Sequence, residues 1–76
     1  MKVLITGVAG LLGSRLADYI IENIQDIEVV GIDDLSGGFK ENIHPKVEFH
    51  QLSLVDGALD TVFNACEIDY VYHFAA

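Results

Sequence analysis

The chain has 76 residues, of which 51% are hydrophobic and 21% are charged, and its formal net charge is -8. This length allows at most one small domain, and the composition is that of a globular chain with a packed core. Twelve acidic against four basic residues would repel a phosphodiester backbone or an anionic bilayer, so nucleic acid and membrane surfaces are poor partners. One cysteine cannot form an internal disulfide, and no apolar run is long enough for a signal peptide or a spanning helix, so we expect a cytoplasmic protein.

The first predicted element is a strand over residues 2–6, an apolar run of β-favouring residues that ends at Gly7. Because both faces of this run are apolar, we expect a central strand of a parallel sheet. A helix should follow from about Gly10 to Asn23, because apolar side chains recur there at every fourth position. These side chains are Leu12, Leu16, Ile20 and Ile24.

Two further strands are expected in the middle of the chain. The apolar, β-branched run over residues 27–32 predicts a strand that ends near Asp33. Periodicity does not decide between a loop and a short helical turn over residues 39–46. Residues 47–54 favour a third strand, and their poor alternation of polar and apolar side chains indicates an outer position in the sheet.

The last predicted elements are a helix over residues 57–67, after the N-cap residue Asp56, and a strand over residues 70–76. Cys66 shares the apolar face of that helix, which favours a packing role over a nucleophilic one. Strands that alternate with helices indicate parallel pairing through crossover helices. We therefore predict an α/β fold, the N-terminal half of a Rossmann-type doubly wound parallel sheet with strand order 3-2-1-4.

A glycine-rich turn with the spacing Gly-x-x-Gly-x-x-Gly lies between the first strand and the helix, at Gly7, Gly10 and Gly13. The first glycine permits a tight reversal, the second a close approach to a pyrophosphate, and the third close packing of the helix on the sheet. Amides at the start of the helix, about Leu11 and Leu12, would face the anion. The turn lacks the Gly-Lys-Ser/Thr ending of a mononucleotide P-loop.

Asp33 strengthens this interpretation, because it follows Gly13 by about 20 residues, the spacing of the acid that binds an adenosine ribose. Its carboxylate would repel a 2'-phosphate, and no arginine follows it, which favours NAD over NADP. Two alternatives stay open. Asp34 could take the same role, or Asp33 could cap a loop while the glycines only permit a tight turn.

Three segments together resemble a known family: residues 6–14 (TGVAGLLGS), 33–43 (DDLSGGFKENI) and 70–76 (YVYHFAA). In this order and spacing they resemble the start of the extended short-chain dehydrogenase/reductases, the NAD-dependent epimerase/dehydratase family that includes UDP-glucose 4-epimerase. The resemblance covers nearly the whole chain. It implies that residues 1–76 are part of an NAD(P)-binding Rossmann domain, that NAD is the cofactor, and that the intact protein acts on a nucleotide sugar.

The resemblance also implies which residues contact the cofactor. Amides of Leu11 and Leu12 would bind the pyrophosphate. The adenosine and the rest of the cofactor would be contacted by Asp33, Asp34, Ser36, Gly38, Ser53, Leu54, Phe74, Ala75 and Ala76. The family usually has Asp where this chain has Ser53, so we expect weaker adenine binding.

The catalytic groups that the resemblance implies are not among these 76 residues. In the family, a Tyr-x-x-x-Lys pair with Ser or Thr removes a hydroxyl proton while hydride passes to NAD, and none of Tyr19, Tyr70 and Tyr72 has Lys four positions later. We expect an epimerase or dehydratase as the intact protein and no catalysis from this chain alone. A non-catalytic NAD sensor or scaffold of the same fold is the alternative.

The strand over residues 70–76 raises two further expectations. His73 matches the histidine that the family has in this strand, whose role looks structural. The strand ends the chain without a covering element, so we expect a piece of a longer protein. Its unpaired outer edge predicts self-association, for instance as a symmetric antiparallel pair.

Overall fold

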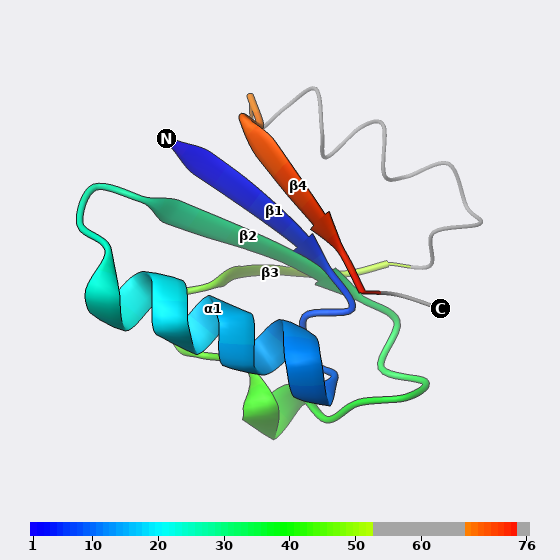
Figure 1. Ribbon diagram of the computed structural model, residues 1–76. Coiled ribbons are helices and arrows are strands. Elements are labelled where there is room, and N and C mark those ends of the chain that lie inside the picture. The colour runs from blue at the N-terminus through cyan, green and yellow to red at the C-terminus, as the bar shows by residue number, and fades with distance from the viewer. Residues whose placement is uncertain (53–66, 75–76) are drawn as a thin grey trace.

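The computed structural model describes residues 1–52 and 67–74. In this part of the chain, four parallel strands form one sheet in the order β3-β2-β1-β4 (Figure 1). The elements are β1 (Lys2–Thr6), α1 (Leu11–Asn23), β2 (Glu28–Asp33), the 3-10 helix η1 (Lys40–Asn42), β3 (Glu48–Gln51) and β4 (Tyr70–His73). The predicted α/β class and the strand order 3-2-1-4 are confirmed.

β1 is the central strand because it pairs with β2 on one side and with β4 on the other. Its side chains from Val3 to Thr6 are at most 3% exposed. Successive side chains point to opposite faces, so Val3 and Ile5 join the core cluster that contains residues of α1, while Leu4 joins the cluster on the other face. The apolar run near the start of the sequence thus forms the buried strand that it predicted.

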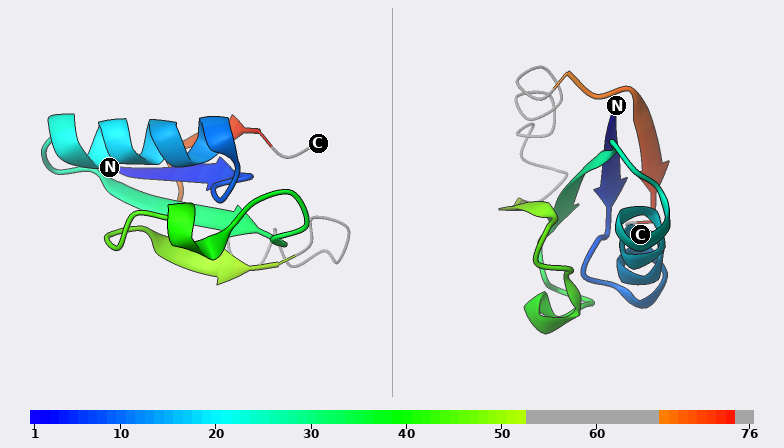
Figure 2. Two further views of the ribbon diagram at one scale, coloured as in Figure 1. Left: turned by 90° about the horizontal axis from the view of Figure 1, so that it is seen from below. Right: turned by 90° about the vertical axis from the view of Figure 1, so that its left-hand side faces the viewer.

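α1 lies along one face of the sheet (Figure 2) and packs through small and branched side chains. Its buried residues are Gly13, Ser14, Ala17 and Ile20. The predicted apolar stripe is wrong at both ends, since Leu12 is 65% exposed and Ile24 is 43% exposed. At Leu12 the physical reason is Gly13, where a Cβ atom would overlap with the carbonyl group of Gly7, so the helix turns Gly13 and not Leu12 toward the sheet. Ile24 is the C-cap residue and lies beyond the last residue of the helix.

The outer strands are shorter than predicted. β3 covers Glu48–Gln51, at the edge of the sheet as expected, and β4 covers Tyr70–His73. The 3-10 helix η1 occupies part of the segment whose conformation periodicity left open. Glu67, the predicted end of a helix, has a φ of 52° and lies in a turn. Residues 57–66 of that predicted helix, with Cys66, lie outside the described residues.

The carboxyl ends of the four strands lie at one edge of the sheet, because all the strands run in the same direction (Figure 1). β1 leads into the glycine-rich turn there, β2 ends at Asp33, and β4 is followed by Phe74. In doubly wound sheets, ligands bind at this edge, where the strand order reverses. Neither helix in the described part of the chain is long and apolar enough to cross a lipid bilayer.

Candidate functional site

The turn between β1 and α1 is held by its own backbone. Gly7 has a φ of 73°, in the left-handed region, and its amide donates to the carbonyl oxygen of Ile32 at 2.8 Å. The amide of Gly10 donates to the carbonyl oxygen of Gly7 at 3.1 Å, and a Cβ atom on Gly10 would lie 3.3 Å from the same oxygen. The glycines therefore allow α1 to begin directly against the end of β1.

The first turn of α1 leaves its amides available to an anion. Among the described residues, no side chain caps Gly10 at the helix start, and the first turn contains no acidic residue. Leu11 and Leu12 are exposed residues in this first turn. Uncapped amides and the positive end of the helix dipole stabilise a negatively charged group at this position.

Asp33 faces the glycine-rich turn from the end of β2. One carboxylate oxygen, Oδ2, accepts a hydrogen bond from the Ala9 amide at 2.9 Å, and Oδ1 accepts one from the Leu35 amide at 2.8 Å. Leu35 has a φ of 66°, in the left-handed region. Each carboxylate oxygen has a second lone pair, so Asp33 can still accept hydrogen bonds from two hydroxyl groups.

Asp34, the other candidate acid, bonds within its own loop. Its Oδ1 accepts hydrogen bonds from the Ser36 hydroxyl at 2.7 Å and from the Ser36 amide at 2.9 Å. The hydroxyl first, and then the amide, hold the pKa of Asp34 below its ordinary value of 3.8. Of the two acids that the sequence offered, Asp33 is the one that contacts the glycine-rich turn.

The segment of residues 34–42 also lies against this turn. A Cβ atom on Gly38 would overlap with the peptide group between Ala9 and Gly10. The carbonyl oxygen of Ala9 accepts hydrogen bonds from the Phe39 amide at 3.3 Å and from Nδ2 of Asn42 at 3.2 Å. No local sequence pattern marks Asn42 as part of the site, because its partner Ala9 lies 33 positions away.

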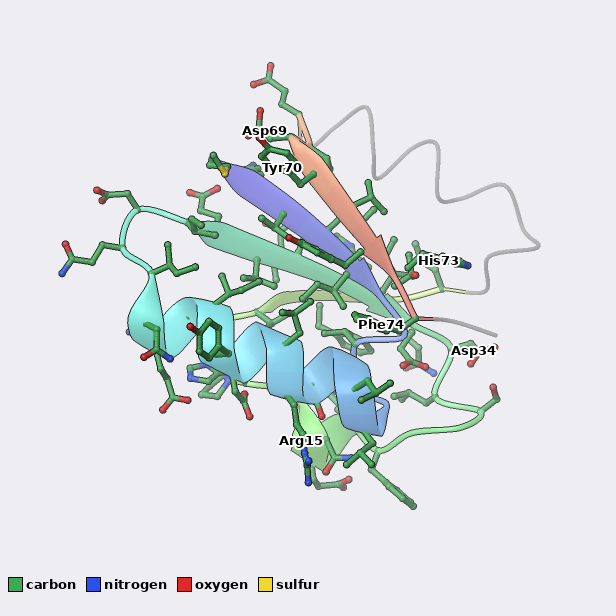
Figure 3. All side chains as sticks on the ribbon, in the orientation of Figure 1. Arg15, Asp34, Asp69, Tyr70, His73 and Phe74 are labelled. Carbon is green, nitrogen blue, oxygen red and sulfur yellow. The ribbon has the colours of Figure 1, made fainter. Side chains whose placement is uncertain are left out.

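The end of β4 is tied to the end of β1. Oγ1 of Thr6 and Nδ1 of His73 lie 2.7 Å apart, and the Phe74 amide donates to the carbonyl oxygen of Thr6 at 3.0 Å. Figure 3 shows His73 and Phe74 at the same end of the sheet as Asp34, and Asp69 and Tyr70 at the opposite end of β4. The contact with Thr6 fits the structural role that was expected of His73.

The structure thus gathers part of the predicted site at the carboxyl edge of the sheet. The glycine-rich turn, Asp33 and Gly38 are in contact, whereas Asp34 and Ser36 bond to each other in the loop. Ser53, Leu54, Ala75 and Ala76 lie outside the described residues, so their roles stay predictions. Residues 1–52 and 67–74 contain no cluster of three or more His, Cys, Asp or Glu side chains that could bind a metal ion.

Known proteins match this chain over its whole length. The model of the NAD dependent epimerase/dehydratase family matches residues 3–76. UDP-glucose 4-epimerase of Mycolicibacterium smegmatis is 37% identical over 81 aligned positions, which cover 100% of this chain and 25% of that protein.

Solved structures of UDP-glucose 4-epimerases are similar to this chain in fold as well as in sequence. The crystal structure of UDP-glucose 4-epimerase from Thermotoga maritima, determined with UDP-glucose, has a TM-score of 0.92 at 36% identity and covers 100% of this chain and 24% of that one. UDP-glucose 4-epimerase from Thermus thermophilus, in complex with NAD, has a TM-score of 0.90 at 32% identity, with 100% and 24% covered. The chain spans about a quarter of the length of the proteins that it matches.

Proposed function

Because this chain belongs to the NAD-dependent epimerase/dehydratase family, we propose that it forms the NAD-binding N-terminal segment of an enzyme that epimerises or dehydrates a nucleotide sugar. The family resemblance expected from the sequence is confirmed, and dependence on NAD goes with the family. The single observation that carries the proposal for this chain is the pairing of Asp33 with the glycine-rich turn beside the uncapped start of α1.

The residues at the turn offer the hydrogen-bonding groups and the local charge that would bind a dinucleotide. Amides of Leu11 and Leu12 would bind the diphosphate, and Asp33 would accept ribose hydroxyls with its remaining lone pairs. A chain with a net charge of -8 can bind an anionic cofactor in this way, because the helix amides supply the positive potential. Gly38 and Phe74 flank this edge of the sheet and would border the cofactor.

The carboxylates at the end of β2 favour NAD over NADP. Asp33 lies at the turn, Asp34 follows it, and residues 34–42 contain no arginine that could bind a 2'-phosphate. A phosphate next to a carboxylate is repelled, so this charge arrangement discriminates against NADP.

Bound NAD would supply the hydride acceptor and donor of the reaction. The Tyr-x-x-x-Lys pair that the family resemblance implies is not among the 76 residues. We propose that the intact protein carries out the chemistry and that this chain alone does not. A non-catalytic sensor would lack the Tyr-x-x-x-Lys pair in the intact protein, whereas an enzyme would have it. The complete sequence of the intact protein distinguishes the two.

Two broader expectations stay predictions. Residues 1–76 would be part of a larger Rossmann domain, which the fourfold greater length of the relatives supports. A cytoplasmic location is the second.

Isothermal titration of the intact protein tests the proposed site. We expect NAD to bind at least tenfold more tightly than NADP, and Asp33→Asn to weaken NAD binding by about tenfold, because a charged acceptor of ribose hydroxyls is lost. Asp34→Asn is the matched control, since it removes the neighbouring charge from a carboxylate that bonds only Ser36 in the described structure. Failure to bind NAD, equal affinity for NADP, or equal effects of the two substitutions would contradict the proposal.

A further inference from the structure

The segment of residues 34–42 holds the glycine-rich turn from outside, through Ala9. The carbonyl oxygen of Ala9 accepts a hydrogen bond from the Phe39 amide at 3.3 Å and another from Nδ2 of Asn42 at 3.2 Å. The Ala9 amide donates to Oδ2 of Asp33 at 2.9 Å. Both polar backbone groups of Ala9 are therefore bonded to residues that lie at least 24 positions later in the chain.

η1 is the element that brings two donors to one oxygen. The Asn42 amide donates to the carbonyl oxygen of Phe39 at 3.0 Å, which closes a tight turn of i to i+3 type. In such a turn, the first residue and the fourth lie close together. The main-chain amide of Phe39 and the side-chain amide of Asn42 therefore meet at the same carbonyl group.

Ala9 has little room to move away from these contacts. Its side chain is 0% exposed, and Gly38 packs so closely on the peptide group between Ala9 and Gly10 that a methyl group would overlap with it. Gly10 follows as the N-cap of α1, with an extended backbone at a φ of -77° and a ψ of 174°. The peptide group that Asn42 holds thus directly precedes Gly10, the residue from which the chain enters the helix.

We propose that Asn42 is a positioning residue for the diphosphate-binding turn. Its side-chain amide fixes the Ala9 carbonyl group and thereby aims the amides of Leu11 and Leu12, without touching the cofactor itself. This inference rests on the proposed function, because it takes a diphosphate as the group that those amides bind. Asn42 would then act on affinity for the diphosphate part of a ligand and not on affinity for its adenosine part.

The expected effect is moderate. When Asn42 is replaced, the Ala9 oxygen keeps its hydrogen bond from Phe39 and is not left without a partner. Loss of one hydrogen bond in a partly exposed position then corresponds to an affinity loss of about three- to tenfold for a diphosphate ligand.

The variant Asn42→Ala tests the proposal, with Asn23→Ala as its matched control. Nδ2 of Asn23 also donates to a main-chain carbonyl oxygen, that of Tyr19 at 2.9 Å, but at the far end of α1. Amide hydrogen exchange without ligand, followed by NMR, should become faster at Ala9 and Gly10 in Asn42→Ala and stay unchanged there in Asn23→Ala. Titration with ADP should show the three- to tenfold loss for Asn42→Ala alone, whereas affinity for adenosine should be the same in all three proteins.

Two results would overturn the proposal: unchanged exchange at Ala9 and Gly10, or an equal loss of affinity for ADP and adenosine, as general destabilisation would produce. If the unsubstituted protein binds neither ADP nor NAD, the proposed function fails, while the exchange rates still decide whether Asn42 fixes the turn. Should Asn42→Ala not fold, Asn42→Asp keeps the shape of the side chain, removes the donor, and provides the same exchange measurement.

Discussion

Asp33 and Asp34 are adjacent in the sequence, yet their carboxylates bind different parts of the protein. Asp33 ends β2 and accepts a hydrogen bond from the amide of Ala9, whereas Asp34 begins the loop and accepts two hydrogen bonds from Ser36. Spacing from the glycines predicted an acid at the end of this strand. It did not decide between the two, because the choice depends on which side chain faces the turn.

The first prediction at the residue scale concerns the pKa of Asp34. Ser36→Ala should raise it toward 3.8, because the Ser36 hydroxyl is the largest cause of its lowering. The hydrogen bonds favour the ionised carboxylate, so their contribution to stability is present at neutral pH and is lost as the pH falls through the lowered pKa. An NMR titration of the carboxyl carbons measures the change, and Ser36→Thr, which keeps the hydroxyl, should leave the pKa low. An unchanged pKa in Ser36→Ala would show that the hydroxyl does not stabilise this carboxylate.

The second residue-scale prediction concerns the contact between Thr6 and His73, whose Oγ1 and Nδ1 atoms lie 2.7 Å apart. Thr6→Val keeps the shape of a buried side chain and removes the hydroxyl, so it should lower the free energy of unfolding by about 0.5–1.5 kcal/mol. Urea denaturation of both single variants and of the double variant with His73→Ala isolates the interaction. Additive effects of the two substitutions would mean that this hydrogen bond contributes nothing to stability.

At the scale of elements, the start of α1 depends on contact with the backbone of the preceding turn. Gly13→Ala should destabilise the protein by about 2 kcal/mol or more, although alanine favours helices by about 1 kcal/mol, because its Cβ atom would overlap with the Gly7 carbonyl group. Gly37→Ala is the control, since no atom lies within 4 Å of a Cβ built there, and its effect should stay within about 0.5 kcal/mol. Urea midpoints compare the two variants, and equal midpoints would contradict the close contact at Gly13.

The elements themselves were largely predictable, and two of the errors have a common cause. Apolar runs located β1 and β2, and the βαβ pattern predicted the strand order, because both depend on burial along a short stretch of chain. The predicted stripe on α1 failed at Leu12, since the orientation of the helix follows from the contact of Gly13 with Gly7. Asn42 was missed for the same reason, because its partner is distant in the sequence.

At the scale of the whole molecule, β4 presents apolar side chains beside α1. A groove of about 260 Å³ lies between them, lined among others by Tyr19, Ile24, Tyr70 and Tyr72. Among the described strands, β4 pairs only with β1, so its outer edge has no partner there. Unpaired apolar edges favour association with another chain.

Self-association through β4 therefore remains our prediction for this chain. Sedimentation velocity should show a dimer that increases with protein concentration and with salt, because salt screens the repulsion between two chains of net charge -8. Val71→Lys places a charge on the edge strand and should abolish the dimer. Phe39→Lys, an exposed apolar position away from β4, should leave it intact. A single monomeric species at high concentration would rule out this mode of association.

The position of β1 between β2 and β4 has a consequence for biosynthesis. Thr6 and His73, which meet at the carboxyl ends of β1 and β4, are separated by 67 positions. The pairing of β1 with β4 can therefore form only after residues that leave the ribosome much later than β1 itself. Contacts between distant parts of a chain slow folding, because the loop between them has to close first. On the side that faces β4, β1 therefore stays unpaired until residues 70–73 have been synthesised and have left the ribosome.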